Sequence, residues 1–115
     1  MSTGNMPIFV RSYDFLSWLV PMTNRFPKAQ RFTVTSRLLD AAFEMREQLE
    51  AAQYRHGHER MQALNQADEA LSKVRMYLRL GHHWDWMSLG QYEDSARMLA
   101  EIGRLLGGWQ KVTIN

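Results

Sequence analysis

The stretch RFPKAQRFTVTSRL, residues 25–38, separates two parts of the chain that differ in character. Residues 12–26 before it are apolar almost all round, whereas a long amphipathic pattern follows it. Pro27 interrupts the chain because its ring fixes φ and it has no amide hydrogen to donate. Thr33 is a suitable N-cap for a helix that starts just after it. The stretch therefore predicts a turn between two helices.

Apolar residues recur at helical spacing on both sides of this turn, which predicts an all-α protein. The first helix is expected over residues 12–26, with Ser12 as its N-cap and a kink at Pro21. A helix that is apolar on all sides is usually buried on more than one side, so this helix predicts a partner subunit. The second helix is expected from Thr33 to about residue 54.

The third helix is expected over residues 58–80 with Gly81 as its C-terminal cap, after a turn marked by Gly57. Ser88 and Gln91 form a Ser-x-x-Gln capping box that opens the fourth helix. Helices two to four have similar lengths and short connections, which favours an up-down-up-down four-helix bundle. The predicted core stripes of these three helices are Leu38, Ala42, Met45, Leu49 and Ala52; Leu64, Ala67, Leu71, Val74 and Leu78; and Tyr92, Leu99, Ile102 and Leu106.

With 115 residues the chain is long enough for one domain with a core of its own. We expect a flexible N-terminal tail over residues 1–11, the bundle over 12–111 and a C-terminal tail over 112–115. The chain has no cysteine, and no apolar run approaches the roughly 20 residues of a membrane span. A cytoplasmic protein without a membrane partner is expected, and the net charge of +2 permits a nucleic-acid partner.

The histidines and carboxylates are the candidates for metal ligands and for catalytic groups. His56/His58 and His82/His83 fall in turns at opposite ends of an up-down bundle, so one subunit cannot join the two pairs. Carboxylates on helix two have the spacing of solvated surface charge, and no nucleophile or glycine-rich phosphate loop stands in a recognisable setting. We therefore expect no metal, no cofactor and no catalysis, and a protein that acts by binding.

Basic residues form three sets that could contact a polyanion. The first lies in the opening stretch, which has no acidic residue, and can be either a solvated corner or a binding site. The second lies within VRMYLRL on helix three and borders the core stripe, so it could instead pair with Asp40 or Glu44. The third follows one outer stripe of helix four and could be ordinary charge neutralised by neighbouring helices. The three sets are Arg25, Lys28, Arg31 and Arg37; Arg75 and Arg79; and Arg97, Arg104 and Lys111.

Three glycines interrupt the fourth helix within EIGRLLGGWQK, where each costs about 1 kcal/mol relative to alanine. Gly103 and Gly107 are four residues apart, so they could let another backbone approach one face closely. Trp109 could fill the space that the missing side chains leave. The alternative is that Gly107 and Gly108 simply end the helix.

FPKAQRFTVTSRL, VRMYLRL and EIGRLLGGWQK, in this order on four helices, resemble the accessory variability determinant (Avd) family. Members of that family are four-helix-bundle accessory proteins of diversity-generating retroelements. The likeness spans residues 13–111, and the proteins encoded in 23S rRNA intervening sequences share the same outline. The tail VTIN adds no basic residue, unlike a nucleic-acid-binding arm.

The resemblance implies a homopentameric barrel that binds the retroelement's reverse transcriptase and contacts template RNA or cDNA without sequence preference. Arg75 and Arg79 match the family's paired arginines, and Arg31 matches its basic position before helix two. Gly103, Gly107, Gly108 and Trp109 match its C-terminal signature. Two alternatives stay open: a structural oligomerisation module whose arginines pair within the assembly, and a relative of the rRNA-insert proteins.

Overall fold

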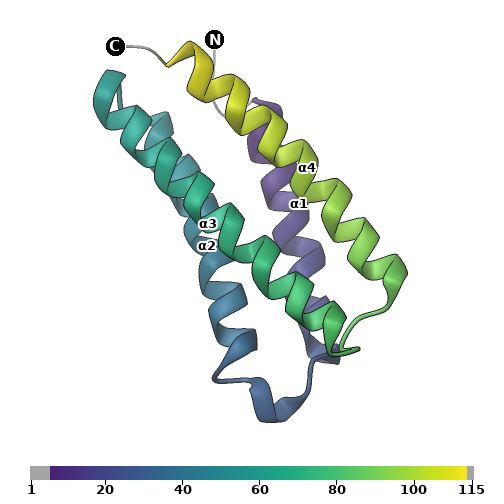
Figure 1. The fold of residues 1–115 in the computed structure, drawn as a ribbon. Coiled ribbons are helices and arrows are strands. Elements are labelled where there is room, and N and C mark those ends of the chain that lie inside the picture. The colour runs from purple at the N-terminus through teal and green to yellow at the C-terminus, as the bar shows by residue number, and fades with distance from the viewer. Residues whose placement is uncertain (1–5, 114–115) are drawn as a thin grey trace.

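The computed structural model describes residues 6–113, and within that range the chain is all-α. The main helices are α1 (Pro7–Met22), α2 (Val34–Gln53), α3 (Gly57–His83) and α4 (Leu89–Val112). Two short 3₁₀ turns, η2 (Thr23–Arg25) and η3 (Lys28–Gln30), connect α1 to α2. The helices alternate in direction along the bundle, which confirms the predicted four-helix fold (Figure 1). None of the described helices is both long and apolar enough to cross a membrane.

The first helix starts earlier than the sequence suggested. Pro7 occupies the start of α1, where its missing amide hydrogen costs nothing, and Ile8 and Phe9 are buried in the core. Ser12 is therefore not the N-cap but a buried residue whose hydroxyl donates to the Phe9 carbonyl at 3.3 Å. The expected flexible tail over 1–11 is wrong for residues 7–11, whereas residues 1–5 lie outside the described range.

The first helix also ends earlier than expected, in the turn that contains Pro21. Met22 is its last residue, and the chain tightens into η2 instead of continuing to Phe26. One side of α1 is buried in the core, including Phe15 and Leu19. The opposite side exposes apolar surface, with Val10 50% and Tyr13 66% accessible to solvent.

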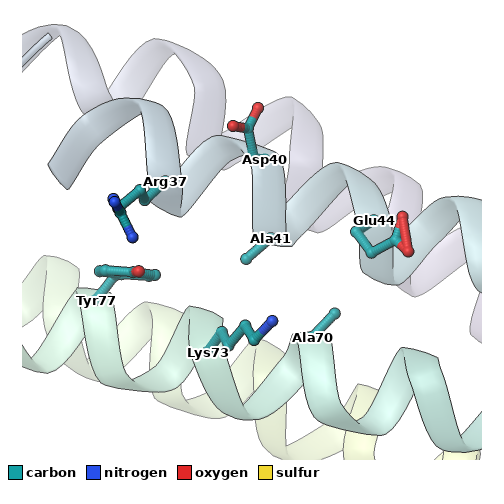
Figure 2. Close-up of a pocket in the computed structure, with 7 residues that line it drawn as sticks. All are labelled: Arg37, Asp40, Ala41, Glu44, Ala70, Lys73 and Tyr77. Atoms are coloured by element: carbon teal, nitrogen blue, oxygen red, sulfur yellow. The ribbon is translucent and has the colours of Figure 1, made fainter. Parts of the chain in front are cut away.

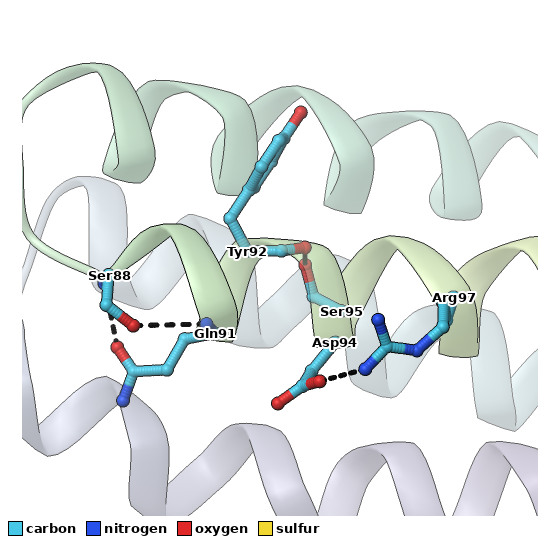
Figure 3. A network of polar contacts seen from close by, with 6 residues as sticks. All are labelled: Ser88, Gln91, Tyr92, Asp94, Ser95 and Arg97. Atoms are coloured by element: carbon cyan, nitrogen blue, oxygen red, sulfur yellow. Dashed lines mark hydrogen bonds and ion pairs between the residues drawn. The ribbon is translucent and has the colours of Figure 1, made fainter.

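The remaining boundaries follow the predicted signals closely. Thr33 is the N-cap residue of α2, although its hydroxyl donates to Gln30 instead of capping the helix. The predicted capping box of α4 is present, with the Ser88 hydroxyl accepting from the Gln91 amide at 3.1 Å and the Gln91 side chain accepting from the Ser88 amide at 2.9 Å (Figure 3). All the predicted core positions are buried except Tyr92, which is half-buried.

The C-terminal end of α3 differs from the prediction in an informative way. Asp85, not Gly81, takes the left-handed conformation, with φ of 61°. The Trp86 amide donates to the Gly81 carbonyl at 2.8 Å and the Asp85 amide to the His82 carbonyl at 3.0 Å, which is the Schellman pattern of a helix end. Gly81 lies inside the helix because the ring of Phe26 packs against it; an added Cβ there would lie 2.9 Å from Phe26 Cζ.

We predict that Gly81→Val lowers the free energy of unfolding by about 1–3 kcal/mol, because the added side chain overpacks the contact with Phe26. Urea unfolding followed by circular dichroism measures this change. Gly90→Val is the matched control, since only the Ser88 hydroxyl lies near that position, at 3.9 Å. Phe26→Leu in the Gly81→Val background should recover part of the loss. Equal stabilities of the two valine variants would show that the Phe26 contact is not tight.

Candidate nucleic-acid interface

A groove of about 160 Å³ runs between α3 and α4 and carries the second basic set. Arg75 and Arg79 lie one helical turn apart on α3, so both side chains reach the same groove. The α4 side is lined largely by small or apolar residues, including Ser95, Ala96 and Ala100, which leave space for the guanidinium groups. Tyr92 also lines the groove. The sequence prediction named the two arginines but not this wall of α4.

Gly103 has a specific role in this groove. The Arg75 Nη2 atom donates to the Leu99 carbonyl of α4 at 3.3 Å, and a Cβ at Gly103 would lie 2.9 Å from that nitrogen. The glycine therefore admits a guanidinium group across α4, whereas the sequence suggested that it admits another backbone. The hydrogen bond uses one donor of Arg75, and a guanidinium has five.

Neither arginine of the groove takes part in an ion pair within residues 6–113. The alternative that they pair with Asp40 or Glu44 is wrong, because these carboxylates lie on the other side of α3. They line a separate groove of about 270 Å³ between α2 and α3, together with Arg37 of the opening stretch (Figure 2). Lys73 and Tyr77 complete that groove from α3 (Figure 2).

The basic stripe on the outer face of α4 is largely neutralised. Arg97 pairs with Asp94, and the Nε atom of Arg104 donates to Glu101 at 2.7 Å (Figure 3 shows the first pair). The Arg104 hydrogen bond lowers the pKa of Glu101, helped by the charges of Arg104 and Arg11. Both partners lie three residues earlier on the same helix, not on a neighbouring helix as expected. Lys111 stays exposed and forms no ion pair within the described chain.

The opening stretch brings three of its four basic residues to one end of the bundle. Arg25, Lys28 and Arg31 are exposed in the connection between α1 and α2, and Lys28 and Arg31 line a hollow of about 250 Å³. Arg37 is separated from them because it lies on α2 and faces the groove shared with carboxylates. The stretch is therefore both a turn between two helices and a cluster of exposed cations.

The C-terminal glycines are not explained by this chain alone. α4 continues to Val112, so the alternative that Gly107 and Gly108 end the helix is wrong. An added Cβ at either position would meet nothing within 4 Å in the described chain. Trp109 does not fill that space but packs in the core, edge-on to Phe9 with ring centroids 5.9 Å apart.

The two histidine pairs lie at opposite ends of α3, as expected. Within residues 6–113, no group of three or more histidine and carboxylate side chains is placed to hold a metal ion. His82 instead stacks on Tyr92, with ring centroids 4.7 Å apart and planes 6° from parallel. The two tryptophans of HHWDW were not among the predicted site residues, although two tryptophans in a short turn are a visible signal.

We predict that Gly103→Ala has little effect on stability in the wild-type background and raises it by about 1 kcal/mol in an Arg75→Ala background. Alanine has the higher helix propensity in both backgrounds. In the wild-type background, however, the added methyl group displaces the Arg75 hydrogen bond, which contributes about 0.5–1.5 kcal/mol. Urea unfolding of the four proteins of this double-mutant cycle gives the coupling. The same effect in both backgrounds would mean that Gly103 does not accommodate Arg75.

Comparisons with known proteins agree with this description of the fold. A crystal structure of a protein of unknown function from the S23 ribosomal protein family of Bacteroides thetaiotaomicron VPI-5482 has a TM-score of 0.81 and 19% sequence identity, over 90% of this chain and 95% of that one. At this identity the likeness concerns the fold alone. No curated protein matches the sequence. The bAvd-like family model matches residues 6–113, which include all four helices and both groove arginines, and the chain therefore belongs to the bAvd-like family.

Proposed function

We propose that this chain is a non-catalytic accessory subunit of a diversity-generating retroelement. In that role it binds the reverse transcriptase together with its template RNA and cDNA, and so supports mutagenic copying of a template repeat. Membership of the bAvd-like family supports an accessory role. The observation that carries the binding role is the α3–α4 groove, where Arg75 and Arg79 are exposed without a carboxylate partner in the described chain.

The chemistry of the groove suits phosphate groups. A guanidinium group offers a planar fork of donors that matches phosphate oxygens, and it stays charged at every physiological pH. Contacts of this kind carry no sequence information, so binding is sequence-independent and weakens with salt. The exposed cations Lys28 and Arg31 contribute by a smaller margin, because they lie on a connection between helices. The protein is cytoplasmic and uses no cofactor in this proposal.

The proposed assembly is a homo-oligomer, most simply the pentamer that the family resemblance implies. Two apolar or unfilled surfaces of the single chain support it. The outward side of α1 exposes the apolar side chains of Val10, Tyr13 and Val20, which a second copy could cover. The space beside Gly107 and Gly108 is open in the described chain, so a second copy can approach the α4 backbone there.

A second candidate function is a structural oligomerisation module without a nucleic-acid role. The pairing of Arg97 with Asp94 and of Arg104 with Glu101 favours it, because it removes much of the free positive charge from α4. A role like that of the proteins encoded in 23S rRNA intervening sequences is the other alternative without a retroelement. A neighbouring reverse transcriptase gene with template and variable repeats would favour the retroelement role over both.

We predict that Arg75→Gln together with Arg79→Gln weakens binding to DNA and RNA and to the polymerase–RNA complex. The slope of log affinity against log salt on duplex DNA should fall by roughly 1.8, from about 0.9 per phosphate contact. Fluorescence anisotropy over a salt series measures both quantities, after circular dichroism and oligomer size have confirmed the fold.

The matched control is Arg97→Gln together with Arg104→Gln, which removes the same net charge from residues already paired with carboxylates. This control should lose less affinity than the groove variant. Equal losses of affinity in the two double variants would mean that Arg75 and Arg79 contribute to binding only through their net charge. Wild-type affinity and salt slope in the groove variant would leave the two arginines without a binding role.

We also predict that Gly107→Leu reduces the oligomer to smaller species while the helix content is retained. An added Cβ at this position meets nothing within 4 Å in the described chain, so loss of assembly with retained helix content would point to contact with another copy. Light scattering and circular dichroism make the two measurements. Gln66→Leu, which adds a similar side chain to an exposed position on α3, is the control. An unchanged oligomer, or a wild-type protein of 13.5 kDa in solution, would contradict the proposed assembly.

A further inference from the structure

Two connections of the bundle meet at one end, and an aromatic row joins them. The α1–α2 connection supplies Phe26, and the turn between α3 and α4 supplies Trp86 and Trp84. The ring centroids of Phe26 and Trp86 are 5.4 Å apart, and those of Trp86 and Trp84 are 5.0 Å apart. Figure 1 shows the two connections at the same end, away from the α2–α3 turn. We call these three residues the aromatic row.

The aromatic row runs from the core to the surface. Phe26 is buried, Trp86 is half-buried and Trp84 is 46% exposed. The Schellman turn fixes the backbone between the two tryptophans, because Asp85 holds the left-handed conformation and both flanking amides are hydrogen-bonded. The Trp84 indole also packs against the Trp86 indole and presents an exposed flat apolar surface.

Two cations lie beside the inner end of the aromatic row. Phe26 also lines the hollow of about 250 Å³ that Lys28 and Arg31 border, so the cations and the row share one residue. Residues 25–38 contain no carboxylate, and Asp85 is the acidic residue of the turn over 84–87. Neither Lys28 nor Arg31 forms an ion pair within residues 6–113. Phe32, 88% exposed, adds a further ring to the same connection.

We propose that this end of the bundle binds a short unpaired segment of nucleic acid, with bases stacked from Trp84 outward and phosphates held by Lys28 and Arg31. Aromatic rings beside cations suit single strands, because an unpaired base exposes its flat face whereas a duplex hides it. Stacking of this kind tolerates any base. The inference rests on the proposed function for its class of ligand, but it assigns a second site and a preference for unpaired strands.

The positive charge beside the aromatic row favours nucleic acid over a protein surface as the ligand. An apolar protein partner could pack on the indoles alone and would gain no binding energy from the cations beside Phe26. A polyanion that also carries flat apolar rings uses both features at once. Single-stranded template RNA and cDNA have that combination, and the α3–α4 groove, which lacks an exposed tryptophan, does not require unpaired bases.

The test compares a labelled oligothymidylate with a duplex of equal length, by fluorescence anisotropy on the full chain at one salt concentration. Trp84→Ala should weaken single-strand binding at least about fivefold, the lower end of the loss for one base–aromatic stack. It should change duplex affinity by less than about twofold. Tyr54→Ala, an exposed aromatic residue after the end of α2, is the matched control and should change neither affinity.

Two further variants separate stacking from charge and from misfolding. Trp84→Phe keeps a stacking face and should restore most of the single-strand affinity. Arg31→Gln should weaken single-strand binding and lower its salt slope more than Arg55→Gln, an exposed arginine next to Tyr54. Circular dichroism and oligomer size confirm that each variant is folded before binding is compared.

Three results would overturn the inference and leave the proposed function standing: wild-type single-strand affinity in Trp84→Ala, equal losses for single strand and duplex, or no advantage of phenylalanine over alanine at position 84. Loss of polymerase binding by Trp84→Ala with unchanged oligonucleotide affinity would assign the row to a protein partner instead, and overturns it too. If the wild-type protein binds neither strand form, the proposed nucleic-acid role fails together with the inference.

Discussion

The close approach of α2 and α3 is the constraint on which the rest of the structure depends. Small side chains make it possible, because the interaxial distance of two packed helices is set by the residues at their contact. This pair is the most extensive helix contact of the bundle, and α1 and α4 pack against the hairpin that it forms. The buried alanines of the hairpin are Ala41, Ala42, Ala52, Ala63, Ala67 and Ala70. Two of them, Ala41 and Ala70, also line the groove between α2 and α3, so larger residues there would change that groove.

α3 consequently divides the charge of the molecule. Toward α2 it presents Lys73 to a groove that contains Asp40 and Glu44, where positive and negative charge compensate each other. Toward α4 it presents Arg75 and Arg79 to a groove without a carboxylate. The same helix is therefore electrostatically quiet on one side and basic on the other. The net charge of +2 understates the positive charge that a polyanion would contact on the side of α3 that faces α4.

Most of the fold could be predicted from the sequence because helical periodicity and capping are local signals. Ser88 with Gln91 and Thr33 placed two helix starts correctly. One error arose where a tertiary contact overrides a local preference. Gly81 resembles a helix end in the sequence, but Phe26, distant in the chain, requires a glycine there, and the left-handed position passes to Asp85.

The candidate site was predictable in its residues but not in its partners. The spacing of Arg75 and Arg79 put them on one face, yet no sequence pattern could show that Leu99 accepts a hydrogen bond from Arg75. The i,i+3 spacing of the α4 arginines and the preceding carboxylates indicates these pairs, whereas the expected partners lay on neighbouring helices. Grooves depend on which small residues face each other, and that information is tertiary.

The contact between Phe9 and Trp109 has a consequence for synthesis of the protein on the ribosome. It joins the first helix to the last turns of α4, so the Phe9 ring is synthesised long before the Trp109 ring. The α2–α3 hairpin is local in sequence and can form while the chain is still growing. α1 must wait until all of α2, α3 and α4 have emerged before α4 covers its inner side. Nascent chains therefore carry an incompletely covered apolar helix until α4 has emerged, and closure of the bundle sets the earliest moment at which two folded copies can meet.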